Sequence, residues 1–105
     1  MNDRDYIIAH ELKRRLANAL DLIDFKVYGS KARDEGDEFS DLDVFIEVLT
    51  LDKKTKDLIL EIAWEVGFEN STVVSPLVFS VDEIENSPLR ASPILMNIKE
   101  EGIPI

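Results

Sequence analysis

The sequence reads Val27-Tyr28-Gly29-Ser30-Lys31-Ala32-Arg33 and, six residues later, Ser40-Asp41-Leu42-Asp43-Val44-Phe45-Ile46. A short apolar run that stops at Gly-Ser is typical of a strand that ends in a turn. The next apolar run carries two acidic residues at its beginning, and ten residues separate Ser30 from Asp41. A connection of this length in so short a chain is usually functional or disordered, and its chemistry decides between the two.

The second of these runs, Leu42 to Val48, predicts a strand in which side chains alternate between the two faces of a sheet. Asp41 and Asp43 then share a face, with their Cα atoms about 7 Å apart. Two like charges on one sheet face repel each other unless a cation lies between them. Both carboxylates can converge on a hard cation such as Mg²⁺.

The Gly29-Ser30 turn predicts a phosphate site in front of these carboxylates. Glycine permits close approach of the backbone to a ligand, and backbone amides at the start of a helical turn point toward anions. The Ser30 hydroxyl adds a hydrogen bond, and the Arg33 guanidinium can hold phosphate through two hydrogen bonds. Taken singly, these residues are a common turn, a surface arginine and a solvated acidic pair. Their order and combination favour the ligand site.

The rest of the chain predicts an α/β fold with one short central sheet. Apolar residues at helical spacing predict a helix over 5–23, in which Ile23 is the last buried residue, and a strand follows at 25–28. Thr50 is predicted to cap a helix that Gly67 ends, with Trp64 and Phe68 in the core. A strand over 72–79 contains Pro76, which indicates an edge or a bulge. An acidic turn at 82–86, a helix over 93–101 and an edge strand at 103–105 complete the chain.

Composition limits the classes of function. The 105 residues predict a single domain over 1–105. The formal net charge of −10 argues against non-specific nucleic acid binding. The chain has no cysteine, its N-terminus is too charged to open a signal peptide, and no apolar run approaches the length that spans a membrane. These features predict a cytoplasmic protein.

The quoted stretch closely resembles the motif of the DNA polymerase beta-like nucleotidyltransferase superfamily, which is Gly-Ser, ten residues, then Asp-x-Asp. The Ala-Arg after Gly-Ser-x and the serine before Asp41 are similar to the minimal nucleotidyltransferases of bacteria and archaea. The motif covers the 15 residues from Gly29 to Asp43. The resemblance implies the small nucleotidyltransferase fold, α/β (α+β), with a short mixed sheet and helices packed mainly on one face.

The resemblance also implies a chemistry. Asp41 and Asp43 would bind Mg²⁺ in a two-metal site, and ATP or another NTP would be the substrate. Gly29 and Ser30 would hold its phosphates, with Arg33 as a supporting contact. Enzymes of this superfamily usually carry a third carboxylate on the next core strand, but 72–79 contains no acid. Glu69, just before that strand, is our preferred substitute; Glu47 is a poor one, because about 13 Å of strand separates it from Asp43.

Two functions remain open from the sequence. The minimal proteins are typically encoded beside a helical HEPN protein, as toxin–antitoxin pairs, and the resemblance implies an antitoxin that transfers AMP to a hydroxyl of that partner. The absence of an acid from 72–79 favours the alternative, an impaired nucleotidyltransferase fold that neutralises a partner by contact. A free-standing transferase acting on a small molecule is disfavoured by length, and whether the chain forms a homo-oligomer stays open.

Overall fold

Helices and strands alternate along most of the chain in the computed structural model, which describes residues 1–37 and 39–105. The helices are α1 (Asp3–Ala19), α2 (Gly29–Ala32), α3 (Lys53–Glu69), α4 (Val81–Asn86), the 3₁₀ helix η1 (Pro88–Ala91) and α5 (Pro93–Glu101). The strands are β1 (Leu22–Tyr28), β2 (Leu42–Val48), β3 (Val74–Ser80) and β4 (Ile103–Pro104). The predicted α/β class is therefore confirmed.

The four strands form one mixed sheet in the order β3-β2-β1-β4. β1 is antiparallel to both β2 and β4, whereas β2 and β3 are parallel. β3 and β4 are the two edges, as Pro76 and the terminal residues predicted. Proline has no N–H to donate, so an edge strand accommodates it without losing a hydrogen bond to a neighbouring strand.

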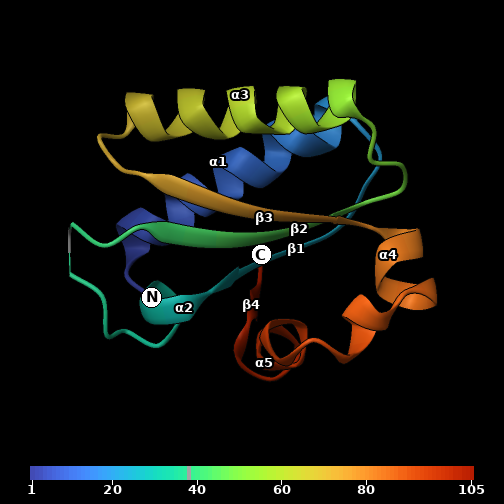
Figure 1. Cartoon of the computed structure of the whole chain (residues 1–105). Coiled ribbons are helices and arrows are strands. Elements are labelled where there is room, and N and C mark those ends of the chain that lie inside the picture. Colours follow the sequence, from blue (N-terminus) through green and yellow to red (C-terminus); the bar gives the residue numbers. More distant parts are fainter. Residues whose placement is uncertain (38) are drawn as a thin grey trace.

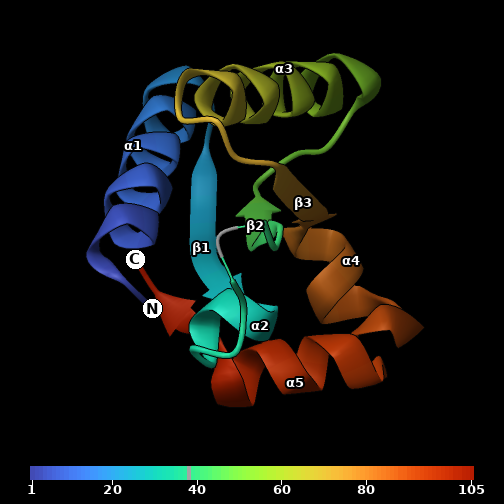
Figure 2. The same ribbon diagram turned by 90° about the vertical axis from the view of Figure 1, so that its left-hand side faces the viewer.

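The two 17-residue helices α1 and α3 cover one face of the sheet (Figures 1 and 2). The side chains of β2 that point toward them form the centre of the core, and each is at most 1% exposed: Leu42, Val44, Ile46 and Val48. Because these alternate with the acidic positions of the same strand, Asp43 and Glu47 face the other side of the sheet.

The second face is covered only in part, by the shorter helices α2, α4 and α5 (Figure 2). A small apolar cluster formed by Phe45, Phe79 and Ile98 holds α4 and α5 against the sheet, and the ring centroids of Phe45 and Phe79 are 6.2 Å apart. These helices do not cover Asp43 completely, and its side chain is half-buried. The two long helices therefore lie on one face, as predicted, and the three short helices lie on the other.

The boundary between α1 and β1 differs from the prediction. α1 ends at Ala19, and Leu22 already pairs with Val48 of β2. The register shifts between Leu22 and Asp24, which makes Ile23 the extra residue of a bulge, and its side chain is exposed. The prediction that Ile23 is the last buried residue of the helix is wrong, because Leu22 and Ile23 belong to strand β1 and not to the helix.

The ends of α3 also differ. Asp52, and not Thr50, caps the helix, accepting a hydrogen bond from the Thr55 N–H at 2.7 Å. Gly67 lies inside the helix, which continues to Glu69. A Cβ at Gly67 would lie 2.7 Å from the Thr72 carbonyl oxygen, so this glycine permits close contact with the chain that leads into β3.

Other boundaries agree with the sequence. β2 and α5 have the predicted limits, and Gly102 caps the end of α5. The acidic turn at 82–86 is α4, begun by a capping box between Ser80 and Glu83. No helix in the described residues is long and apolar enough to cross a membrane.

Candidate active site

The two predicted carboxylates lie at the beginning of β2, on the face that the small helices cover only in part. Asp43 belongs to the strand, and Asp41 immediately precedes it and is exposed. Partial burial raises the pKa of Asp43, the negative charge of Asp41 raises it further, and the positive charge of Arg33 lowers it. The carboxylates and Arg33 therefore act on one another electrostatically, as a common site requires.

Gly29 lies directly against Asp43. The antiparallel register places Tyr28, the last residue of β1, opposite Asp43, so the chain turns into α2 beside that carboxylate. Gly29 has a φ of 75°, and a Cβ added there would lie 2.5 Å from Asp43 Oδ2. Both the backbone conformation and the available space require glycine. The structure thus brings the Gly-Ser turn and the Asp-x-Asp pair together.

We expect Gly29→Ala to lower the free energy of unfolding by about 1–3 kcal/mol, because the side chain imposes a strained φ and displaces the Asp43 carboxylate. Nucleotide and divalent-cation affinity should fall as well. Urea denaturation and calorimetric titration with Mg²⁺ and a non-hydrolysable ATP analogue measure the two effects. Gly67→Ala is the matched control, since its Cβ would meet the Thr72 carbonyl oxygen and Val74, and no acidic side chain. Equal losses of affinity in both variants would contradict a specific role for Gly29.

Ser30 is held by the loop that follows it. The Ser30 carbonyl oxygen accepts hydrogen bonds from the N–H groups of Glu35 (2.9 Å) and Gly36 (3.2 Å). A Cβ at Gly36 would lie 2.9 Å from Ser30 Oγ and 3.2 Å from the Ser40 side chain. The sequence analysis missed Gly36, although a glycine inside the loop was the available signal. Its absent side chain lets the loop fold onto the Ser30 hydroxyl.

The Arg33 guanidinium is oriented by two acidic residues. Its Nε donates to Glu35 Oε2 at 2.9 Å, and its Nη1 lies 3.7 Å from Glu101 Oε2 at the end of α5. Arginine has five N–H donors, so these two partners leave donors for a phosphate oxygen. The lowering effect of Arg33 on the pKa of Asp43 places its charge within reach of the site.

A buried ion pair that the sequence analysis missed supports the loop. Lys31 and Asp5 are 3% and 2% exposed, and Lys31 Nζ lies 3.4 Å from Asp5 Oδ2. The same Nζ donates to the Asp37 carbonyl oxygen at 2.7 Å. Lys31 thereby ties the loop after Ser30 to the first turn of α1. The sequence carried little signal for this, because a lysine in a short turn and an aspartate at a helix start usually face solvent.

Glu69, predicted as a third carboxylate, is not brought to the aspartates. It ends α3, in the helical layer on the opposite face of the sheet, where it accepts hydrogen bonds from Arg15 Nη2 at 2.6 Å and Nη1 at 3.3 Å. In the parallel register of β2 and β3, the residue beside Asp43 is Ser75. No group of three histidine, cysteine or acidic side chains is arranged to hold a metal ion within residues 1–37 and 39–105.

Glu47 shares the face of Asp43 but lies in a different environment, beyond Phe45 on the same strand. Burial raises the pKa of Glu47, and the negative charges of Asp24 and Glu85 raise it further. The apolar contacts of Phe45 with Phe79 separate the two acidic positions. The expectation that Glu47 is a poor third ligand agrees with this arrangement.

Comparison with known proteins identifies the fold. No protein-family model and no curated protein matches the chain. Among solved structures, a chain of a toxin–antitoxin complex with AMP-PNP is similar over 98% of this chain and 72% of its own length, with 19% identity and a TM-score of 0.62. The chain has the small nucleotidyltransferase fold.

A second solved structure has the same nucleotidyltransferase fold. It is a chain of a mutant form of the toxin–antitoxin complex MntA–HpeT, similar over all of this chain and 72% of its own length, with 19% identity and a TM-score of 0.59. The resemblance stated from the sequence is therefore confirmed for the fold. The positions of Gly29, Asp41 and Asp43 follow from this chain's own geometry.

Proposed function

We propose that this protein is a Mg²⁺-dependent nucleotidyltransferase that transfers a nucleoside monophosphate, AMP from ATP, to a hydroxyl group. The observation that carries the proposal is the closeness of Gly29 to Asp43, which brings the turn that we propose binds phosphate next to the carboxylate that we propose binds the metal. The toxin–antitoxin neighbour with AMP-PNP supports the choice of an adenine nucleotide.

The residues present fit one divalent cation. Asp41 and Asp43 supply two carboxylates. Burial, and then the negative charge of Asp41, raise the pKa of Asp43, and a bound cation would offset both effects. Phosphate oxygens of the nucleotide would complete a coordination shell of hard oxygen ligands. A second ion would have the same two carboxylates and, at the neighbouring position of β3, the Ser75 hydroxyl in place of an acid. The proposed two-metal site would therefore hold its second ion weakly.

The chain's own residues then have the following roles. The Gly29 backbone and the Ser30 hydroxyl hold the β- and γ-phosphates, and Arg33 neutralises phosphate charge. In the transfer, the acceptor hydroxyl releases its proton to solvent and its oxygen forms a bond to the α-phosphorus. The bond from that phosphorus to the bridging oxygen of the β-phosphate breaks, and pyrophosphate leaves. Bound Mg²⁺ supplies the positive charge that stabilises the attacking and leaving oxygens.

The acceptor that we propose is a hydroxyl on a helical HEPN-type toxin encoded nearby, which the modification would neutralise. Both solved neighbours are chains of toxin–antitoxin complexes, and this supports the role of antitoxin. The net charge of −10 favours a protein partner over a nucleic acid. We place this reaction in the cytoplasm.

The test is transfer of a radioactive label from α-³²P-ATP to the neighbouring gene product in the presence of Mg²⁺. We expect label on that protein, its loss with excess EDTA, and none from γ-³²P-ATP, because the γ-phosphate leaves with pyrophosphate. Parallel reactions with the other three nucleotides identify the donor. No transfer from any nucleotide would contradict the enzymatic proposal.

One observation favours a second function, neutralisation of a partner by contact alone. Ser75 stands beside Asp43 where the superfamily resemblance implies an acid. If contact suffices, Asp41→Ala/Asp43→Ala will still rescue growth of cells that express the toxin. If transfer is required, the double variant will bind the toxin but will not rescue growth.

A further inference from the structure

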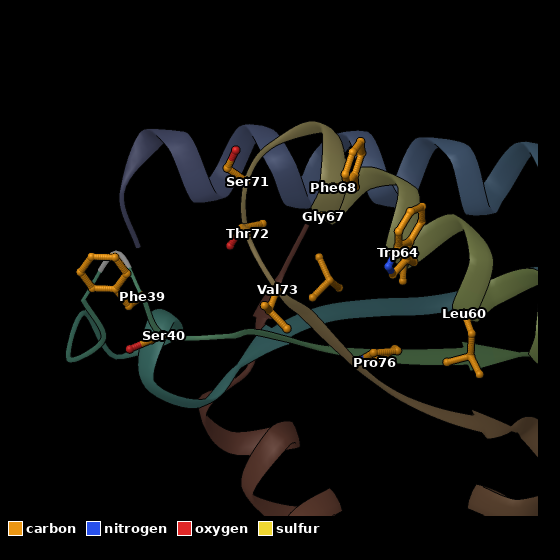
Figure 3. A pocket seen from close by; sticks show the side chains of 12 residues that line it. Phe39, Ser40, Leu60, Trp64, Gly67, Phe68, Ser71, Thr72, Val73 and Pro76 are labelled. Carbon is orange, nitrogen blue, oxygen red and sulfur yellow. The ribbon is translucent and has the colours of Figure 1, made fainter.

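Four large apolar side chains gather on the outer surface of the sheet edge, and no part of the transfer reaction uses them. Leu60, Trp64 and Phe68 are 44%, 66% and 73% exposed on α3, and Val73, just before β3, is 62% exposed. They line the space between α3 and the chain that enters β3, and Figure 3 shows these side chains on the two segments. The prediction that Trp64 and Phe68 pack in the core is wrong: the core side of α3 is formed by Ile59, Ile62, Ala63 and Val66.

These side chains line a groove of about 630 Å³ between α3 and β3. The rings of Trp64 and Phe68 are stacked, with centroids 5.2 Å apart and planes inclined by 13°. Phe39 and Ser40, which directly precede Asp41 in the chain, line the same groove (Figure 3). Contiguous exposed apolar surface of this kind marks interaction sites.

The backbone at this edge does not favour a partner strand. β3 has a free edge, but Pro76 in its middle lacks an N–H group, and proline on an edge strand opposes pairing with another chain. The side chains offer a different match. Leu60, Trp64 and Phe68 recur every four residues and form a stripe about 12 Å long. A partner helix can place apolar side chains at spacings of three and four residues into such a groove.

Charge selects among partners. Asp57, Glu61 and Glu65 follow the apolar stripe along α3, and all three are exposed. Asp57 pairs with Lys53, whereas neither Glu61 nor Glu65 forms an ion pair within the described part of the chain. A second copy would bring the same acidic row and a further net charge of −10. A partner with Lys or Arg beside its apolar residues is complementary.

We propose that the groove between α3 and β3 docks an amphipathic helix of another protein, whose apolar stripe is bordered by basic residues. Trp64 is the central anchor, because large aromatic side chains at the centre of an apolar site dominate binding. Docking is separate from nucleotidyl transfer and requires neither Mg²⁺ nor nucleotide. It brings the partner to Phe39 and Ser40, which directly precede Asp41.

Trp64 provides an intrinsic reporter, since it is the only tryptophan of the chain. The probe is a fluorescein-labelled synthetic peptide of about 18 residues, long enough for five helical turns, with leucine at helical spacing and lysine on both sides of the stripe. A second peptide has glutamate in place of lysine. We expect the lysine peptide to bind by anisotropy, its unlabelled form to shift the Trp64 emission to shorter wavelength, and the glutamate peptide to bind at least 10-fold more weakly.

Three variants locate the site. Trp64→Ala should weaken binding of the lysine peptide about 30-fold, in the range of an interface anchor. Glu61→Lys/Glu65→Lys should reverse the preference between the two peptides. Ile7→Ala is the matched control, because Ile7 is 69% exposed on α1 and outside the groove. It should change the affinity by less than about twofold, and thermal denaturation checks that all variants are folded.

The following results would overturn the proposal. If the lysine peptide does not bind, or if Ile7→Ala weakens binding as much as Trp64→Ala, the groove is not the docking site. If both peptides bind equally to the protein, basic residues do not select the partner. If sedimentation shows a dimer that Trp64→Ala dissociates, the occupant is a second copy. None of these outcomes depends on transfer activity, so the docking proposal and the proposed enzymatic activity are tested independently of each other.

Discussion

Lys31→Met is expected to lower the free energy of unfolding by about 3–5 kcal/mol, the cost of leaving one member of a buried ion pair without its partner. Lys31 and Asp5 are both almost completely buried, and Asp5 Oδ1 has no hydrogen-bond partner within the described residues. Arg4 Nη1 is 3.7 Å from that oxygen and only partly replaces the lost charge. A domain is typically stable by about 5–15 kcal/mol, so this loss is a large share.

A double-mutant cycle separates the pair from general damage. Asp5→Leu/Lys31→Met replaces both charges by apolar side chains, which is often nearly neutral for a buried pair. We therefore expect the double variant to recover most of the stability that Lys31→Met loses, measured by urea denaturation. A loss below about 1 kcal/mol for Lys31→Met, or additive losses in the cycle, would show that the two side chains do not interact as a buried pair.

The same cycle reports on the site. Lys31 Nζ also donates to the Asp37 carbonyl oxygen, within the loop that folds over Ser30. We expect the double variant to recover stability, but methionine cannot donate this hydrogen bond. Its affinity for an ATP analogue should therefore stay below that of the wild-type protein, which identifies Lys31 as a positioning residue.

The carboxylate pair and the Gly-Ser turn were predictable from the sequence because local chemistry determines them. Because side chains alternate along β2, Asp43 points to the face of the sheet away from the core residue Val44, whatever the tertiary context. The turn needs a glycine where β1 ends, and Gly29 is found there with a positive φ. The resemblance to the superfamily motif implied that the two segments form one site, and the register of β1 with β2 shows how they meet.

Features that depend on distant contacts could not be predicted in this way. Helical spacing continued through Leu20 to Ile23, but pairing with β2 takes Leu22 into a strand. Gly67 resembled a helix stop, whereas its role depends on the position of the Thr72 carbonyl oxygen. Burial of Lys31 depends on where α1 passes beneath the loop. Leu22 and Lys31 have partners distant in sequence, Val48 and Asp5, whereas Thr72 is only five residues from Gly67, and its position depends on how the chain enters β3.

The two faces of α3 illustrate a further limit. Apolar residues lie on both sides of this helix, so periodicity alone does not show which stripe meets the sheet. The structure assigns Ile59, Ile62 and Val66 to the core and leaves Trp64 and Phe68 outside. A helix with more apolar surface than its own core needs has surface available for a partner, and this is the basis of the docking proposal.

Asp43→Asn is expected to lower nucleotidyl transfer by about 100-fold or more, the order observed when one group that stabilises transition-state charge is removed. The amide keeps the shape of the side chain beside Gly29 but loses the negative charge that would bind Mg²⁺. The same substitution should make the protein more stable, because ionised Asp43 is half-buried and close to Asp41. Functional sites commonly carry such a cost in stability.

The sign of the stability change follows from the pKa. In the folded protein the pKa of Asp43 lies above its ordinary value, so the unfolded chain ionises more readily and folding loses stability as the pH rises through that interval. At pH 7 the full cost is present, and Asp43→Asn removes it. Solvent screens a partly exposed group, so we expect about 0.5 kcal/mol, or roughly 2–4 °C in thermal midpoint without metal. Below the ordinary pKa of aspartate the difference should vanish.

Glu47→Gln separates stability from catalysis. Glu47 lies on the same strand and face, and its pKa is raised by burial and by the neighbouring charges of Asp24 and Glu85. It should therefore stabilise the protein in the same direction while leaving transfer within about twofold of the wild-type rate. Thermal scans in EDTA and the α-³²P-ATP assay measure the two properties in parallel.

Unchanged transfer in Asp43→Asn would contradict the proposal that Asp43 is a catalytic metal ligand. A lower thermal midpoint of Asp43→Asn than of the wild-type protein would contradict the electrostatic cost of Asp43. If Asp43→Asn loses transfer and Glu47→Gln keeps it, the reaction depends on the end of β2 at which Asp43 lies.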